Sequence, residues 1–303
     1  MKKRQSVRAV VVVLVPMAVL MVVMMVVISP PPLPSIVARL DALSSAAPVV
    51  SGGVVKLWPG DDNCSWAEVR FGEGLAGSWL LSFPRSGNTW TRYLLQAATG
   101  LFTSSVYNSY RLRGLGFLGE GVAVWRGSTL TTKTHSLLPL SRHPHYPVVA
   151  IVRSPAKAIL SYWHYTRSRW APDRFSASDN QATYSTRGFH RFVRDKLAKW
   201  RRTYMFALTN ATRLHLLHYE LLREAPLLHL QELLTFLGHA TPSPRRQACL
   251  ERHLEGVARG AQRPDLPYTS REMKALQAAV KAVDRLARRR GLRGLPDYSR
   301  YHN

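Results

Sequence analysis

The chain has 303 residues, 46% of them hydrophobic, so it is long and apolar enough to bury a sizeable core and is not disordered by composition. Lys and Arg number 42 against 18 Asp and Glu, which gives a net charge of +24. Such an excess indicates an anionic partner: nucleic acid, acidic lipid, a phosphorylated nucleotide or an acidic glycan. The alternative is a solvated basic surface with no single partner.

The N-terminus combines a basic flank with an apolar run. Four basic side chains lie within residues 1–8, and residues 9–28 form an apolar run of 20 residues that only Pro16 interrupts. At about 1.5 Å per residue, a helix of this length spans a hydrocarbon core of about 30 Å. The run is longer than the roughly 7–15 apolar residues of a cleaved signal. We therefore expect an uncleaved transmembrane anchor, with residues 1–8 cytoplasmic and the chain after Ser29 lumenal or extracellular.

A stem and a globular domain are expected after this anchor. Residues 29–56 are rich in Pro, Ala, Ser, Gly and Val, which is typical of a stem, and the domain is expected at residues 57–303. The domain contains both cysteines, Cys64 and Cys249. An oxidising compartment would let them form a disulfide that closes a long loop, and two buried thiols are the alternative. Asn63 and Asn210 begin sequences that fit N-glycosylation acceptors, in agreement with a lumenal domain.

From residue 78 onward, short apolar runs alternate with amphipathic stretches. Strands are expected at residues 78–83, 129–133, 148–152 and 212–217. Helices are expected at residues 89–98, from Pro155, at residues 226–237 and from Thr269 to about Arg290, with Ser154 as an N-cap and Thr269 with Glu272 as a capping box. Strands that alternate with helices predict an α/β fold with a mainly parallel sheet.

The first group of candidate binding residues is Phe-Pro-Arg-Ser-Gly-Asn-Thr-Trp at residues 83–90. It lies between a strand and a helix, where free backbone N–H groups and the positive helix end can bind an anion. Gly87 lets the backbone approach a ligand closely. The side chains that offer donors are Arg85, Ser86, Asn88 and Thr89. The G-x-x-x-x-G-K-[S/T] pattern is absent, which disfavours a nucleotide kinase, and a purely structural turn is the alternative.

A second group combines an arginine with a hydroxyl. Arg153 follows the strand at residues 148–152 and so emerges at its carboxyl end, where α/β sheets bind ligands. Ser161 lies seven residues after Ser154, so two helical turns place both on one face. An arginine and a hydroxyl that face each other can hold a second phosphate.

A third group, Lys133 and His135, follows the strand at residues 129–133. A histidine beside a lysine can act as the general base for a hydroxyl, and a structural histidine is the alternative. If His135 is not the base, a carboxylate such as Glu120 or Glu220 is the next candidate.

Together the three groups resemble the PAPS-dependent sulfotransferase superfamily over roughly residues 57–300. Residues 84–90 are similar to its 5′-phosphosulfate loop, although Arg85 stands where most relatives have Lys. Arg153 with Ser161 is similar to its 3′-phosphate motif, and Lys133-Thr134-His135 to the segment that carries the catalytic base. Residues 218–222, followed by a Leu-rich helix that ends at residue 238, are a further similar stretch.

A closer resemblance is to the sulfotransferase domain of the WSC-domain-containing proteins, a Golgi family associated with sialate O-sulfation. Residues 64–66, 82–90 and 151–155 carry it, whereas the WSC modules themselves are absent from the sequence. The usual Arg-Lys-Gly segment is not evident either, and Arg259 or Arg263 is the candidate to replace it.

The resemblance implies an α/β, P-loop-like three-layer fold with a central, mainly parallel sheet, preceded by the transmembrane helix. It implies a type II Golgi membrane glycoprotein that transfers a sulfuryl group from PAPS to a hydroxyl of a glycan, sialic acid being one candidate acceptor. The implied catalytic residues are His135, Lys133 and Arg85. The implied donor-binding residues are Arg85, Ser86, Gly87, Asn88, Thr89, Trp90, Arg153, Ser161 and Arg259.

Neither a metal ion nor a nucleic-acid partner is expected, since no metal-ligand cluster and no zinc-finger or RNA-recognition motif is seen. The polar stretch at residues 165–187, with Trp163, is a candidate wall of an acceptor cleft, and a solvated loop is the alternative. The rival function is a catalytically inactive, basic membrane protein that binds anionic glycans.

Overall fold

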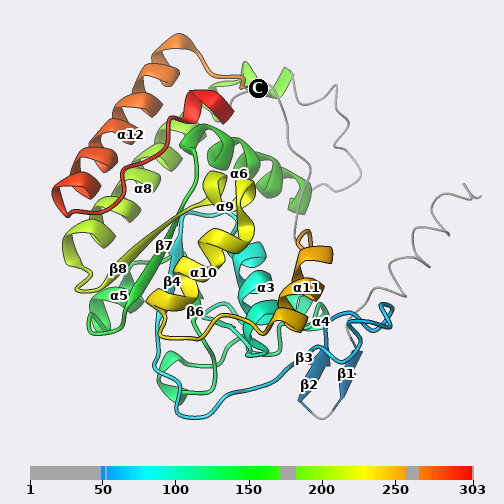
Figure 1. Ribbon diagram of the computed structural model, residues 1–303. Helices are drawn as coiled ribbons and strands as arrows, with labels where there is room; N and C mark the ends of the chain where they lie inside the picture. Colours follow the sequence, from blue (N-terminus) through cyan, green and yellow to red (C-terminus); the bar gives the residue numbers. More distant parts are fainter. Residues whose placement is uncertain (1–48, 52, 171–181, 257–265, 302–303) are drawn as a thin grey trace, which may run out of the picture. The chain divides into compact units, whose positions relative to one another are not determined.

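The computed structural model describes residues 49–301, except residue 52, residues 171–181 and residues 257–265 (Figure 1). Residues 47–303 form a compact unit of their own. The predicted tail, the anchor and most of the stem lie outside the described residues, as does Arg259. In the described part of the chain, no helix combines the length and the apolar character that a membrane crossing requires.

A parallel five-stranded sheet forms the centre of the domain, with the strand order β5-β6-β4-β7-β8. The strands are β4 Trp79–Ser82, β5 Ser104–Ser105, β6 Thr132–Thr134, β7 Val148–Val152 and β8 Leu214–His218. In the register of the sheet, Trp79 of β4 lies between Thr132 of β6 and Val148 of β7. Every residue of β4 and β7 is buried, as a sheet covered on both faces requires. The predicted parallel sheet is confirmed.

Helices cover both faces of this sheet and complete three layers. They are α3 Asn88–Thr99, α4 Tyr110–Gly114, α5 Leu138–Arg142, α6 Pro155–Trp170, α8 Arg187–Asn210, α9 Tyr219–Glu224, α10 Pro226–Phe236, α11 Pro244–Arg252 and α12 Ser270–Arg289, with short 3-10 turns at Val124–Arg126 and Tyr298–Tyr301. Leu81 and Ala150 face a core shared with α6, α8 and α12, whereas Leu80 and Val149 face one shared with α3, α10 and α11. Figure 1 shows these two helix groups on opposite sides of β4 and β7.

A small antiparallel sheet precedes the central one. It comprises β1 Val49–Ser51, β2 Val54–Lys56 and β3 Glu68–Val69, so regular structure begins before Leu57. Just after β2, Cys64 is bonded to Cys249 of α11, 185 residues away in sequence, and both side chains are buried. Of the two alternatives for the cysteines, the structure contains the disulfide. It links the first segment of the domain to its C-terminal third.

Two helix starts test the capping predictions. The Thr269 hydroxyl accepts from the Glu272 N–H while the Glu272 carboxylate accepts from the Thr269 N–H, which confirms the capping box of α12. Helix α6 does begin at Pro155. Ser154 takes the predicted N-cap position, since its carbonyl accepts from the Ala158 N–H, but its buried hydroxyl has no hydrogen-bond partner among the described residues. Its N–H instead donates to the Glu220 carboxylate at 2.9 Å, which anchors the turn between β7 and α6.

Candidate active site

The predicted site residues follow three neighbouring strands of the central sheet. The loop at residues 83–87 follows β4, His135 follows β6 and Arg153 follows β7. Because β6, β4 and β7 are adjacent and parallel, their carboxyl ends meet at one edge of the sheet. The sheet topology therefore brings together groups that lie up to about 70 residues apart in sequence.

The loop at residues 83–87 is shaped to receive an anion. Arg85 and Gly87 have φ angles of 67° and 89°, in the left-handed region. A Cβ atom on Gly87 would lie 2.4 Å from the Cδ2 atom of Tyr219, so only glycine fits there. Helix α3 starts at Asn88, and the described residues supply no side-chain cap to it. The N–H groups of its first turn therefore remain available to an anionic ligand, with the positive end of the helix behind them.

The side chains of this loop have different tasks. The Asn88 amide donates to the Leu80 carbonyl and to the Ser82 hydroxyl, both at 3.1 Å, so the backbone N–H is the donor of this residue that is left for an anion. Ser86 is fully buried and Thr89 is half-buried. Trp90 is buried, donates from Nε1 to the Leu254 carbonyl at 2.7 Å and packs edge-on to the Tyr219 ring.

Two arginines and a hydroxyl meet beside the loop, although the hydrogen bond to Ser161 comes from Arg85 and not from Arg153. Arg153 donates from Nη1 to the Arg85 carbonyl at 2.7 Å, and its guanidinium lies 4.5 Å from the Tyr219 ring centroid. The Arg85 Nε atom donates to the Ser161 hydroxyl at 3.2 Å. The Arg153 Nε atom is buried and has no hydrogen-bond partner within the described ranges. Two neighbouring guanidinium groups and an unused donor form a site suited to a phosphate.

His135 is held in one orientation and one tautomer. Its Nδ1 atom lies 2.8 Å from the Ser82 carbonyl oxygen. A carbonyl only accepts, so Nδ1 carries the proton and Nε2 keeps its lone pair. The backbone N–H of His135 donates to the Tyr107 hydroxyl at 2.7 Å, and the rings of the two residues are stacked. Through Ser82, whose hydroxyl lies 3.1 Å from Nδ1, Asn88 also helps to position this histidine.

Burial and neighbouring cations keep His135 neutral. Burial lowers the pKa of His135 to about 3, with a further contribution from Lys133 and a smaller one from Lys199. Lys133 lies in β6, two residues before His135, which follows the strand. Burial, with Arg92 next, lowers the pKa of Lys133 to about 8, so this side chain is still mostly protonated at neutral pH. The pair thus offers an unprotonated imidazole nitrogen beside a positive charge.

A buried ion pair supports this part of the site. Arg92 of α3 and Glu120 are both fully buried and joined by a hydrogen-bonded ion pair. Arg92 also donates to the Thr103 hydroxyl at 2.8 Å, and the second Glu120 oxygen accepts from the Ser109 N–H at 2.9 Å. Glu120 is thereby committed to structure and is not a candidate base. Sequence reasoning missed the pair, because a lone Arg and a lone Glu 28 residues apart carry no pattern.

A cavity of about 400 Å³ opens next to His135. Its lining residues are Tyr107, His135, Ser136, Leu137, Leu138, Lys199, Arg202 and Thr203. The last three come from α8, a helix that the sequence analysis did not predict. Trp163, which had been considered for an acceptor cleft, instead packs in the core against Phe189 and Phe192. Residues 171–181 of the predicted polar stretch lie outside the described residues.

A second cavity of about 260 Å³ lies beside Arg153. It is lined by Arg153, Lys157, Tyr219, Glu220, Arg223, Glu224, Arg300 and Tyr301. Burial raises the pKa of Glu220 to about 7, against the hydrogen bond from the Ser154 N–H. This carboxyl anchors the turn that carries Arg153. It lines the cavity beside Arg153 and not the one that contains His135.

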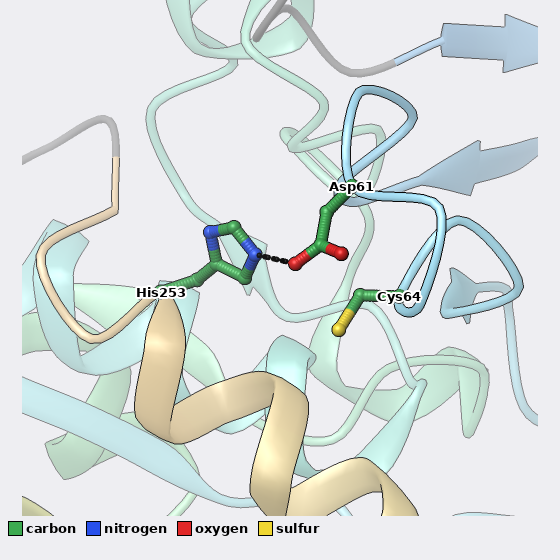
Figure 2. A group of neighbouring side chains, drawn as sticks. All are labelled: Asp61, Cys64 and His253. Carbon is green, nitrogen blue, oxygen red and sulfur yellow. Dashed lines mark hydrogen bonds and ion pairs between the residues drawn. The ribbon is translucent and has the colours of Figure 1, made fainter.

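One further cluster has the composition of a metal site but a different bonding pattern. Figure 2 shows Asp61, Cys64 and His253, whose ligand atoms lie within 4.8 Å of one another. The Cys64 sulfur is bonded to Cys249 and so provides no thiolate. The Asp61 carboxylate is paired with His253 Nε2 at 2.9 Å, and the His253 ring stacks on Trp58. The group is a disulfide beside a hydrogen-bonded pair of Asp61 and His253.

Comparison with known proteins identifies the family. The family model described as "Sulfotransferase domain" matches residues 76–255, which is more than half of the chain and includes the sheet edge described above. The chain belongs to the sulfotransferase family.

Among curated proteins, the chain is similar to WSCD family members of two insects. It is 36% identical over 185 residues to WSCD family member AAEL009094 of Aedes aegypti, which covers 61% of this chain and 57% of that protein. It is 39% identical over 121 residues to WSCD family member GA21586 of Drosophila pseudoobscura pseudoobscura, covering 40% of this chain and 37% of that protein. The chain thus spans between about one third and three fifths of these relatives. The resemblance to WSC-domain-containing proteins is confirmed.

Solved sulfotransferases are also similar to the chain. Mouse sulfotransferase SULT7A1 complexed with PAP is 14% identical, with a TM-score of 0.44 over 69% of this chain and 84% of that one. A sulfotransferase from Alicyclobacillus acidocaldarius is 14% identical, with a TM-score of 0.42 over 75% of this chain and 99% of that one.

Proposed function

We propose that this protein transfers the sulfuryl group of PAPS to a hydroxyl of an acceptor molecule. The observation that carries the proposal is the meeting of three groups at one edge of the sheet. A neutral, oriented histidine lies beside a cavity, an uncapped helix start lies behind a tight loop, and a pair of arginines meets at that loop. Membership of the sulfotransferase family supports this interpretation.

The residues present fit the two phosphate ends of the donor. The N–H groups at the start of α3, with Arg85, are suited to the 5′-phosphosulfate. Arg153, whose Nε donor is buried and unused in the described structure, is suited with Ser161 to the 3′-phosphate. Arg85 donates to Ser161 here, so it lies where it can contact either end. The part assigned to Arg259 stays a prediction, because this residue lies outside the described ranges.

The chemical step follows from the arrangement around His135. The acceptor oxygen attacks the sulfur in line, the new O–S bond forms, and the bond from sulfur to the 5′-phosphate oxygen breaks, which releases PAP. His135 Nε2 takes the proton of the acceptor hydroxyl. Lys133 and Arg85 stabilise the negative charge that develops on the leaving and equatorial oxygens. The negative phosphates of the donor partly neutralise the charge of Lys133, which lowers the pKa of His135 in the free protein. The pKa of His135 therefore rises when the donor is bound.

The transfer assay tests this proposal. The detergent-solubilised full chain is incubated with PAPS labelled with radioactive sulfur and a panel of sialylated, desialylated and glycosaminoglycan acceptors. Label that appears on a glycan, and disappears with Arg153→Ala, supports the proposal. Tight binding of PAP and glycans with no transfer to any of them favours the inactive, glycan-binding alternative.

Donor recognition gives a separate prediction. Arg153→Ala should weaken PAP binding roughly tenfold to hundredfold, because a charge-assisted hydrogen bond contributes about 1.5–3 kcal/mol. Calorimetry with PAP and with adenosine 5′-phosphate, which lacks the 3′-phosphate, measures this effect. The variant should lose most of the preference for PAP. Arg167→Ala, an exposed arginine of α6, is the matched control. Equal wild-type affinity for the two nucleotides contradicts the assignment.

We propose that the protein is a type II membrane protein of the Golgi with its catalytic domain in the lumen. We also propose that its acceptor is a glycan. The apolar run at residues 9–28, its basic flank and the two glycosylation sequences support this topology. The Cys64–Cys249 disulfide is compatible with an oxidising compartment. In intact microsomes, an epitope placed after Asn303 should resist protease until detergent is added. Digestion without detergent contradicts the orientation.

A further inference from the structure

Helix α8 supplies a positively charged wall to the cavity that contains His135. Lys199 and Arg202 line this cavity together with Thr203, and Lys199 and Arg202 are three residues apart, so they lie one turn from each other. Tyr107, stacked on His135, lines the cavity as well. An acceptor hydroxyl that approaches His135 through this cavity therefore passes between an aromatic ring and two cations.

These two cations lack an acidic partner in the described part of the chain. No carboxylate among the described residues lies within ion-pair distance, 4.0 Å, of Lys199 or Arg202; the one acidic residue of α8, Asp195, faces Arg194 at 3.7 Å. Burial, with the charges of Lys196 and Arg202, lowers the pKa of Lys199. A cation that is partly buried beside other cations is stabilised by an anion brought into the same cavity.

The predicted donor contacts do not account for these charges. The loop at residues 83–87 and the Arg85–Ser161–Arg153 group meet at the starts of α3 and α6, whereas Lys199 and Arg202 share their cavity with His135. Lys199 is also close enough to His135 to act on its ionisation. The positive charges of Lys199 and Arg202 thus lie in the cavity through which an acceptor reaches His135.

We propose that Lys199 and Arg202 bind a carboxylate that the acceptor carries near the hydroxyl to be sulfated, and so select acidic over neutral acceptors. The inference rests on the proposed sulfotransferase function and adds the residues that decide which acceptors are used. The carboxylate of a bound acceptor should also change the basicity of His135. The groups that act on His135 are Lys133 from β6, the Ser82 carbonyl from β4, Lys199 from α8 and the Tyr107 hydroxyl. An acceptor carboxylate that neutralises Lys199 makes His135 a better base.

The test compares two acceptors that differ in one charge. Sialyllactose and its carboxyl methyl ester have the same hydroxyl groups, but only the first is an anion. With the full chain and saturating PAPS, the wild type should have a KM for the acid roughly tenfold to hundredfold below that for the ester. Lys199→Met and Arg202→Gln should each raise the KM for the acid about tenfold and leave that for the ester within about threefold.

A matched control lies on the same helix. Lys196 contacts the rings of Tyr162 and Phe192 and is not among the cavity residues, so Lys196→Met should change neither KM. PAP affinity, measured by calorimetry, should be the same in all three variants. Equal use of acid and ester by the wild type overturns the inference, as does an equal loss with both acceptors in the variants. Weaker PAP binding by Lys199→Met and Arg202→Gln also overturns it, because these cations would then serve the donor.

A binding measurement separates this inference from the proposed function. If neither acceptor is sulfated, saturation-transfer NMR with the PAP-loaded protein decides. Binding of the acid but not the ester, abolished by Lys199→Met, supports the carboxylate site while the transfer proposal fails. Absence of such binding overturns the inference.

Discussion

Replacing His135 with Asn should lower kcat roughly 10²–10⁴-fold, because the general base is lost. Asn keeps part of the size and can donate to the Ser82 carbonyl as Nδ1 does, but it cannot accept a proton at neutral pH. PAP affinity and the thermal unfolding midpoint should therefore stay near the wild-type values. Transfer is measured with radiolabelled sulfate, and His145→Asn, an exposed histidine, is the control. Near-normal turnover by His135→Asn contradicts the assignment of the base.

The pH profile gives a second reading of the same residue. An unperturbed histidine would make kcat/KM rise as the pH passes through about 6.5. In the free protein the pKa of His135 is lowered to about 3, so the neutral base is already present above that pH. We therefore expect kcat/KM for PAPS, which reports on the free protein, to show no rise near pH 6.5 that is due to this group. Because burial and Lys133 cause the shift, a Lys133→Met variant should have His135 with a higher pKa.

Much of the fold could be predicted because its signals are local. The run Val-Val-Ala-Ile-Val at residues 148–152 is short, β-branched and apolar at every position, which is typical of a strand covered on both faces, and β7 has these same bounds. The exchange of hydrogen bonds between Thr269 and Glu272 is contained within four residues. The placement of His135 and Arg153 at one edge of the sheet was also predictable, because the residues that follow parallel strands lie at the carboxyl-end edge of their sheet.

The acceptor side of the site could not be predicted, because it depends on contacts between distant segments. Lys199 and Arg202 are two of several basic residues on α8, and only packing of that helix places them in the cavity with His135. The hydrogen bonding of Ser154 could not be predicted for a similar reason. Glu220, 66 residues later, takes the Ser154 N–H and so fixes the turn in another way. Residue type and spacing contain neither fact.

The buried pair of Arg92 and Glu120 leads to the largest expected effect on stability. Glu120→Leu removes the partner of a guanidinium with no exposed surface and leaves an uncompensated charge in the core. Such a loss should lower the free energy of unfolding by about 3–5 kcal/mol. For a domain of this size, the thermal midpoint should then fall by roughly 6–20 °C. The Ser109 N–H also loses its acceptor, which loosens the segment that carries Tyr107.

A double variant distinguishes loss of a charge partner from loss of a catalytic group. Arg92→Met combined with Glu120→Leu fills the same space without charge, and should recover most of the free energy of unfolding that Glu120→Leu loses. Each variant is unfolded thermally and by urea, and its sulfate transfer is measured well below its midpoint. If Glu120 only stabilises the fold, the double variant should regain much of its transfer activity along with its stability. A Glu120→Leu protein that unfolds like the wild type but transfers no sulfate would show instead that Glu120 takes part in the chemistry, and would reopen the choice of base between this carboxylate and His135.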